Sequence, residues 1–165
     1  MLSVKPLSED LLKACSTFLF STELGKNYYP VQKFMDSAIE KAYQTDSIYM
    51  AYENEHLAGV LWYVEKGAFY SYPYLHMIAV DESCRGKGYG KQLLAYMEEK
   101  LLEKKPTSKI YLVVNETNEV AKKMYASVGY KNVGRMEGLY RRGINELLME
   151  KFLSKMTKIR LVDVG

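Results

Sequence analysis

Cysteine is scarce in this chain, which excludes a disulfide scaffold. The 165 residues include two cysteines, Cys15 and Cys84, whereas disulfide-stabilised domains carry several pairs. Such low usage is typical of a reducing compartment. The sequence also has no apolar run long enough to span a membrane and no basic, apolar leader at its start. We therefore expect a cytoplasmic protein that does not bind a membrane.

An excess of one charge sign is also missing. The chain has 23 basic and 20 acidic residues, a formal net charge of +3. Domains that bind nucleic acids concentrate Lys and Arg on one face, so we expect no nucleic-acid partner. The length fits one domain, which we place at residues 1–153, with a tail over 154–165.

Apolar periodicity and breaker residues predict alternating helices and strands. Helices are expected over 8–25, 31–43, 92–104 and 116–128, and strands over 2–5, 47–52, 56–65, 72–80, 109–114, 130–136 and 147–152. Gly25 is expected to end the first helix, residues 27–30 to form a loop, and Gly67 to break a strand. This order predicts an α/β or α+β domain with a mixed sheet.

The segment from Arg85 to Lys91 joins an apolar strand to a helix and contains three glycines. The first N–H groups of a helix have no partner within it and carry partial positive charge, so they attract anions. Glycine allows the backbone to approach a ligand closely. The sequence therefore predicts a phosphate-bearing ligand at this turn.

Two familiar phosphate motifs do not match this turn. A dinucleotide motif needs a third glycine where Lys91 stands, and a P-loop needs a glycine where Arg85 stands. A nucleotide ligand is compatible with the sequence only if Lys91 can replace a glycine.

The pattern that does match is [RQ]-x-x-G-x-[GA], formed by Arg85, Gly88 and Gly90. With this pattern the chain resembles the GNAT superfamily of acetyl-CoA-dependent N-acetyltransferases. Three further blocks also resemble that superfamily, at residues 77–81, 111–118 and 121–130, and residues 146–151 resemble its last strand. Several matching blocks at the right separations are more specific than one short motif.

The resemblance implies a twisted, mostly antiparallel sheet of six or seven strands, flanked by about four helices, with the fourth and fifth strands splayed apart. It implies acetyl-CoA as co-substrate and no metal. The pyrophosphate would lie on the glycine turn, and the pantetheine arm would pair with the fourth strand. The residues that this places at acetyl-CoA are Ile78, Ala79, Val80, Arg85, Gly86, Lys87, Gly88, Tyr89, Gly90, Lys91, Asn118 and Tyr125.

By the same resemblance, Tyr125 stands where the superfamily often has a general acid for the departing thiolate. The alternative is a core tyrosine on an apolar helix stripe. The general base is less clear. His76 has a suitable unperturbed pKa, Tyr74 lies near the position of a base in some members, and Glu82 acting through water is a further alternative. The segment from Arg135 to Met149 resembles the ribosomal-protein-alanine acetyltransferases. Val113 stands where those enzymes have a base glutamate, which argues against the same chemistry on ribosomal-protein N-termini.

Tyrosines are abundant, fifteen in all, and crowd the segments expected to line the acceptor site. We expect Tyr28, Tyr29, Tyr74 and Tyr140 to contact a primary amine of a small molecule or a peptide, because aromatic faces attract cations. The alternative is ordinary packing of a sheet. The alternative function is a non-catalytic module that binds acyl-CoA. The alternating pattern at 158–164 could add an edge strand and support a homodimer.

Overall fold

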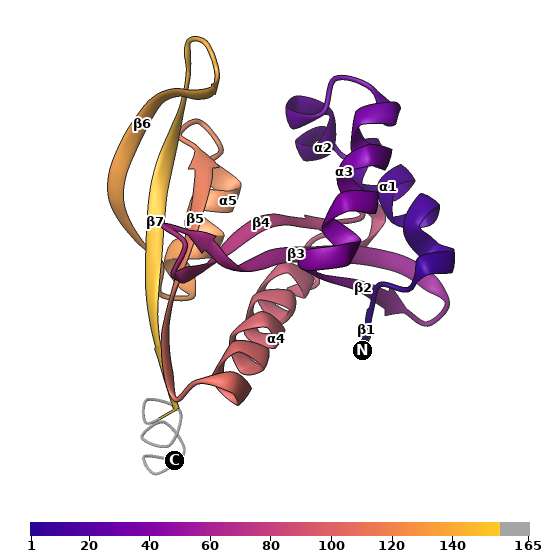
Figure 1. Ribbon diagram of the computed structural model, residues 1–165, viewed down its shortest axis with the longest axis horizontal. Coiled ribbons are helices and arrows are strands. Elements are labelled where there is room, and N and C mark those ends of the chain that lie inside the picture. Colours follow the sequence, from indigo (N-terminus) through magenta and orange to yellow (C-terminus); the bar gives the residue numbers. More distant parts are fainter. Residues whose placement is uncertain (156–165) are drawn as a thin grey trace. The chain divides into compact units, whose positions relative to one another are not determined.

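The computed structural model describes residues 1–155. The strands are β1 (Leu2–Pro6), β2 (Ser47–Glu53), β3 (His56–Ala68), β4 (Tyr72–Val80), β5 (Thr107–Asn115), β6 (Lys131–Arg141) and β7 (Ile144–Ser154). The α-helices are α1 (Leu12–Ser21), α2 (Glu23–Tyr28), α3 (Gln32–Thr45), α4 (Tyr89–Lys104) and α5 (Glu119–Ser127) (Figure 1). The 3-10 turns η1 (Glu9–Leu11) and η2 (Glu82–Cys84) precede α1 and α4.

The strands form one mixed sheet in the order β1-β2-β3-β4-β5-β7-β6. The pairs β1–β2, β2–β3, β5–β7 and β6–β7 are antiparallel, and β4 pairs with β5 in parallel. The parallel register joins Tyr74 to Tyr111 and Leu75 to Leu112, two pairs in strands of nine residues each. This is the mixed, mostly antiparallel seven-stranded sheet that the sequence predicts.

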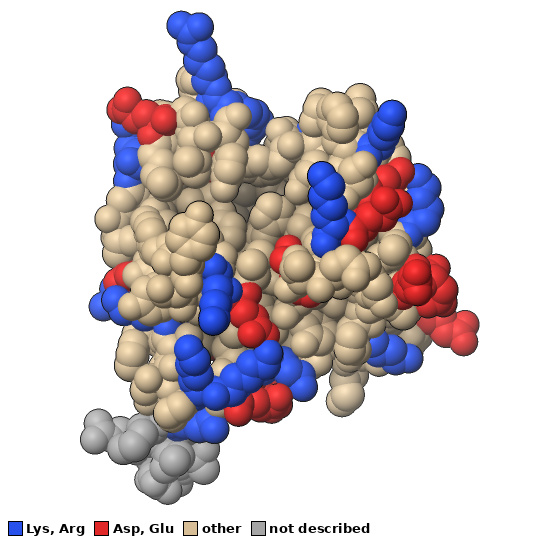
Figure 2. All heavy atoms as spheres, viewed as in Figure 1, with Lys and Arg blue, Asp and Glu red and all other residues tan. Residues whose placement is uncertain are grey.

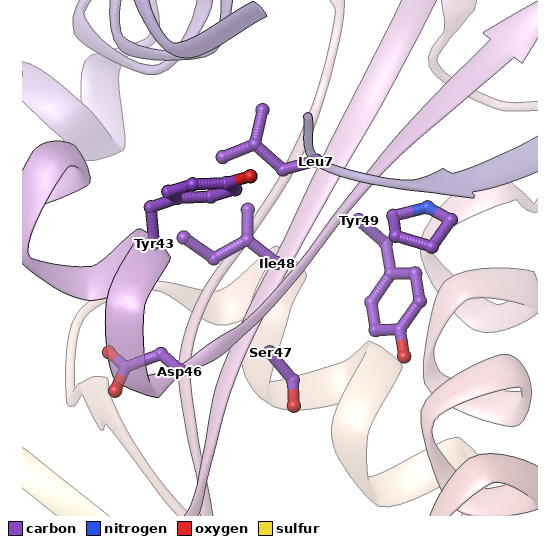
Figure 3. A pocket seen from close by; sticks show the side chains of 7 residues that line it. Leu7, Tyr43, Asp46, Ser47, Ile48 and Tyr49 are labelled. Carbon is purple, nitrogen blue, oxygen red and sulfur yellow. The ribbon is translucent and has the colours of Figure 1, made fainter. Parts of the chain in front are cut away.

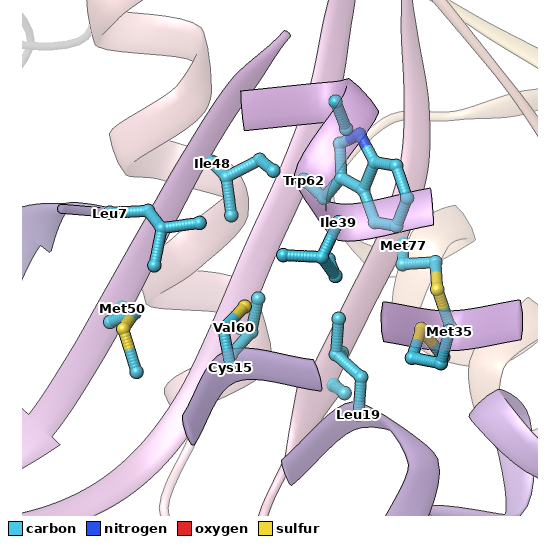
Figure 4. Packing of buried hydrophobic residues seen from close by; sticks show 12 residues of the cluster. Leu7, Cys15, Leu19, Met35, Ile39, Ile48, Met50, Val60, Trp62 and Met77 are labelled. Carbon is cyan, nitrogen blue, oxygen red and sulfur yellow. The ribbon is translucent and has the colours of Figure 1, made fainter. Parts of the chain in front are cut away.

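The described chain divides into two compact units. The first comprises residues 1–65 and 76–90, and its core lies between the sheet and helices α1 and α3. Cys15 and Leu19 from α1 and Met35 and Ile39 from α3 are completely buried there. Figure 4 shows these side chains turned toward Met50, Val60, Trp62 and Met77 of the strands. Apolar residues at helical spacing on both helices form this core, whereas Phe34, predicted on the same face of the second helix, is exposed.

Of the described residues, the second unit comprises 66–75 and 91–155. Its strands β5 and β7 pair over nine residues, from Thr107–Ser154 to Asn115–Glu146. Its buried apolar residues include five from helix α4 and three from strand β5: Leu93, Leu94, Met97, Leu101, Leu102, Ile110, Leu112 and Val114. The helix that carries five of them is the one predicted after the glycine turn.

The prediction of one helix from Ser8 to Gly25 is wrong. The chain makes a 3-10 turn, ends α1 at Ser21 and begins α2 at Glu23. Thr22 caps α2, because its hydroxyl accepts the N–H of Gly25 at 3.0 Å. Gly25 thus lies inside a helix, and the predicted loop at 27–30 begins only after Tyr28.

Other boundaries also differ from the prediction. Gly67 does not break β3, which continues to Ala68. Helix α5 starts at Glu119 instead of Glu116, after an N-cap at Asn118. The predicted edge strand at 158–164 lies outside the described residues.

The surface carries mixed charge. On the face shown in Figure 2, Lys and Arg side chains are interspersed with Asp and Glu and with uncharged residues. No helix in residues 1–155 has the length and apolar character needed to cross a bilayer.

Candidate acetyl-CoA and acceptor sites

The glycine turn has an open backbone. Gly86 and Gly88 both have φ of +78°, a left-handed conformation that favours glycine. A Cβ atom built on either residue would meet no heavy atom within 4 Å. The turn follows η2 and leads into the first residue of α4, Tyr89. The space beside these two backbone positions is therefore open, as the close approach of an anion to the backbone requires.

Glu53, at the end of β2, binds the glycine turn. Lys87 Nζ lies 2.9 Å from both carboxylate oxygens of Glu53, and the Tyr89 hydroxyl donates to the same group at 2.5 Å. The hydrogen bonds from Tyr89 and Lys87 hold the pKa of Glu53 at about 2, below its usual range. The sequence predicts Lys87 at the donor phosphates and gives no local signal for Glu53, which is 34 residues away.

The end of β4 runs into this turn within the first unit. Ala79 is buried in the core cluster, while Ile78 and Val80 are half-buried. The N–H of Asp81, just after the strand, donates to the carbonyl of Ala58 at 2.8 Å. Pairing of Ile78 or Val80 with a pantetheine arm stays a prediction.

His76 lies among aromatic groups in the first unit. Its Nε2 atom is 3.0 Å from the Tyr29 hydroxyl, and its ring centroid is 4.1 Å from that of Trp62. Trp62 in turn donates its ring N–H to Asp46 at 2.9 Å. His76 is exposed, and desolvation of the covered part of its ring lowers the pKa of the imidazole, while the negative charge of Asp46 raises it by a smaller amount. The structure thus joins two predicted site residues, His76 and Tyr29.

Two other predicted acceptor residues meet in the second unit. The hydroxyl groups of Tyr74 and Tyr140 lie 2.9 Å apart. Tyr140 is exposed and Tyr74 is half-buried. Tyr28, the remaining predicted residue, lies at the last position of α2 in the first unit.

Tyr125 and Asn118 belong to α5 in the second unit. Tyr125 is buried, with 7% of its surface exposed, and its ring packs edge-on against Tyr130 at a centroid distance of 5.7 Å. Burial raises the pKa of Tyr125, so its hydroxyl is a proton donor at neutral pH. The Asn118 side chain accepts the N–H of Ala121 and caps the helix. Its capping role is clear, and its role at CoA stays a prediction.

Two of the hollows among the described residues each include a side chain named above, Asp46 in one and Tyr130 in the other. One, of about 190 Å³, opens beside β2 and is lined in part by Leu7, Tyr43, Asp46 and Tyr49 (Figure 3). The other, of about 330 Å³, lies along α5 and includes Lys122, Tyr130 and Met149. Neither is lined by a residue that the sequence assigned to the site.

His56, Asp81 and Cys84 each bring one possible metal-ligand atom within 4.8 Å of the others. The carboxylate of Asp81 is already engaged by His56 at 3.1 Å and by the hydroxyl of Ser83. We assign no metal to this group, and a metal-free enzyme stays a prediction.

The Acetyltransferase (GNAT) family model matches residues 11–130, most of the chain. This match covers the open glycine turn and β4, and the mixed sheet agrees with it. The chain belongs to the GNAT acetyltransferase family, whose members use acetyl-CoA as co-substrate.

Individual relatives share shorter segments or the fold alone. The chain is 36% identical over 67 residues to the N-alpha-acetyltransferase RimI of Mycobacterium tuberculosis. These 67 residues cover 41% of this chain and 40% of that protein. The chain spans less than half the length of the curated relatives it matches.

Two solved structures resemble the whole described fold. The ribosomal-protein-S18-alanine N-acetyltransferase of Escherichia coli has a TM-score of 0.74 at 17% identity, over 93% of this chain and 95% of that one. Mutant forms of the spermidine/spermine N-acetyltransferase SpeG of Vibrio cholerae have a TM-score of 0.72 at 16% identity, over 92% and 95%. At these identities the likeness shows the shared fold.

Proposed function

We propose that this protein is an N-acetyltransferase that moves the acetyl group of acetyl-CoA to a primary amine of a small molecule or a peptide. The observation that carries the proposal is the open backbone at Gly86 and Gly88, found within a chain that matches the GNAT family model. Both glycines have the left-handed conformation found in turns whose N–H groups hold phosphates.

On the donor side, the turn would hold the pyrophosphate and β4 would align the pantetheine arm. Acetyl-CoA supplies the activated acyl group as a thioester. A backbone N–H between Ile78 and Val80 would stabilise the negative charge that develops on the thioester oxygen. Arg85 and Lys91, both exposed, would add attraction for the phosphates.

On the acceptor side, His76 is our choice of general base. Its lowered pKa keeps the imidazole neutral at pH 7, as a base must be before it takes a proton from the amine. The Tyr29 hydroxyl at 3.0 Å and the Trp62 ring fix its orientation. His76 takes the first proton from the ammonium group, the amine nitrogen forms the new bond to the carbonyl carbon, and the carbon–sulfur bond breaks. Tyr125 gives its proton to the thiolate, and the second proton of the amine nitrogen restores the Tyr125 hydroxyl through solvent water.

The acceptor class follows from the aromatic groups and the relatives. The relatives above act, by their names, on a ribosomal-protein alanine and on spermidine or spermine, and both types of substrate present a primary amine. The Tyr74–Tyr140 pair supports an amine that bears positive charge before reaction, because aromatic faces attract cations.

Isothermal titration with acetyl-CoA, followed by a thiol-release assay across polyamines, amino sugars and peptides with free N-termini, tests the proposal. We expect binding and turnover with at least one amine. No binding at millimolar acetyl-CoA would refute the proposal. Tight binding without turnover across the panel would instead support a non-catalytic acyl-CoA-binding module.

Two substitutions test the assigned roles. Tyr125→Phe should reduce kcat by about 10²- to 10⁴-fold and leave acetyl-CoA affinity unchanged, since a general acid contributes about that much. Unchanged turnover would show that Tyr125 is a core residue. For the base, activity of the unmodified protein should fall as the pH drops through a value below 6.5. His76→Gln should abolish that acidic limb, and an unaltered limb would exclude His76.

A further inference from the structure

Glu53 contacts the glycine turn at three points. It accepts hydrogen bonds from Lys87 and Tyr89, and the Cys84 thiol lies 3.6 Å from its Oε2 atom. Cys84 and Tyr89 are buried, with 2% and 7% of their surfaces exposed. Cys84 ends η2, just before Arg85, and Tyr89 begins α4. One carboxylate from β2 therefore contacts Lys87 and the buried residues on both sides of Gly86 and Gly88.

The middle of the turn consists of two glycines on either side of Lys87. Gly86 and Gly88 carry no side chains that could hold it, and a Cβ on either would meet no heavy atom within 4 Å. Two such glycines permit many backbone conformations. The one conformation that binds a ligand must therefore be stabilised by contacts of neighbouring residues. Lys87 lies between them and is anchored to Glu53 by both carboxylate oxygens.

We propose that Glu53 is a positioning residue of the turn, which holds Lys87 and Tyr89 so that the N–H groups of Gly86 to Gly88 are arranged to receive the pyrophosphate of the donor. The inference rests on the proposed function. In this role Lys87 binds Glu53 and not the ligand, and the acid beside the proposed pyrophosphate site has a function. The negative charge is offset by Lys87 and is used to fix the backbone.

The sign of the effect separates this role from simple repulsion. If Glu53 only repelled phosphate, its removal would tighten binding, because a negative charge would be lost and Lys87 would be released. If Glu53 positions the turn, its removal weakens binding, because the flexible turn must be ordered by the ligand. Glu53→Ala tests this directly, and Glu53→Gln keeps acceptor and donor atoms of similar shape without the charge.

The experiment measures the dissociation constants of acetyl-CoA and of S-acetylpantetheine, which lacks the pyrophosphate, by isothermal titration of the full chain. Glu53→Ala should weaken acetyl-CoA binding about tenfold, the usual effect of losing charge-assisted hydrogen bonds. The dissociation constant of Glu53→Gln for acetyl-CoA should lie between those of the unmodified protein and Glu53→Ala. S-acetylpantetheine binding should not change. Glu55→Gln, which removes an exposed acid two residues away, is the matched control and should bind like the unmodified protein.

Three outcomes overturn the inference: tighter or unchanged acetyl-CoA binding by Glu53→Ala, equal weakening of both ligands, or the same weakening by Glu55→Gln. Equal weakening would mean general damage to the fold, and a melting curve of each variant gives an independent check of folding. If the unmodified protein does not bind acetyl-CoA, the proposed function itself fails. The two failures are therefore distinct.

Discussion

Replacing Gly88 by alanine should separate the stability of the glycine turn from its ability to bind a ligand. Gly88 has φ of +78°, and a Cβ there meets no heavy atom within 4 Å. The cost to the folded protein is therefore only the strain of a left-handed alanine, about 1–2 kcal/mol. For a chain of this size that corresponds to a decrease in melting temperature of about 2–8 °C.

The effect on ligand binding should be larger. The space beside Gly88 is where the pyrophosphate would lie, so a methyl group would displace it from the backbone N–H groups. Loss of one hydrogen bond to a charged group costs about 1.5–3 kcal/mol. Gly88→Ala should therefore bind acetyl-CoA about 10- to 150-fold more weakly, as measured by isothermal titration.

Gly143 provides a matched control. It has φ of +79°, and a Cβ there also meets no heavy atom within 4 Å, but it lies in the turn between β6 and β7. Gly143→Ala should show a similar loss of melting temperature with no loss of affinity. Acetyl-CoA binding by Gly88→Ala equal to that of the unmodified protein would refute a phosphate site at this turn. Equal loss of affinity in both variants would show that backbone strain alone explains the effect.

Two further predictions concern stability. Gly25→Ala should lower the free energy of unfolding in urea by about 3 kcal/mol or more, because its Cβ would lie 1.9 Å from the backbone oxygen of Leu19. Gly134→Ala, with its nearest atom at 3.9 Å, should be close to neutral, and similar losses in both would contradict the steric argument. Hydrogen bonds lower the pKa values of Asp36 and Glu116 to about 2, so their contribution to stability is complete above about pH 4.5 and lost toward pH 2. Asp36→Asn should flatten that acid dependence in urea titrations, and an unchanged slope would exclude Asp36 as a source.

Most elements of the fold could be predicted from local pattern, and the errors have a physical cause. Alternating apolar residues located β2, β4 and β5, and glycine spacing located the start of α4 within a few residues. The error at Gly25 arose because glycine commonly ends helices. Here Gly25 is glycine because the carbonyl of Leu19 occupies the place of a Cβ. That close approach depends on the break between α1 and α2, which no local rule predicts.

The chemistry of the site could be predicted only in part, because its electrostatics come from residues distant in sequence. The turn and its three cations could be found locally, but Lys87 binds Glu53 across 34 residues and His76 meets Tyr29 across 47. Pairing changes what each group can do: Lys87 is ion-paired with Glu53, and Arg85 and Lys91 are exposed. The proposed phosphate site would therefore depend on its backbone N–H groups and on these two side chains more than a count of basic residues suggests. The same holds for His76, our proposed base. Tyr29 and Trp62 contact its ring and the charge of Asp46 affects its pKa, whereas its sequence neighbours Leu75 and Met77 do not indicate that role.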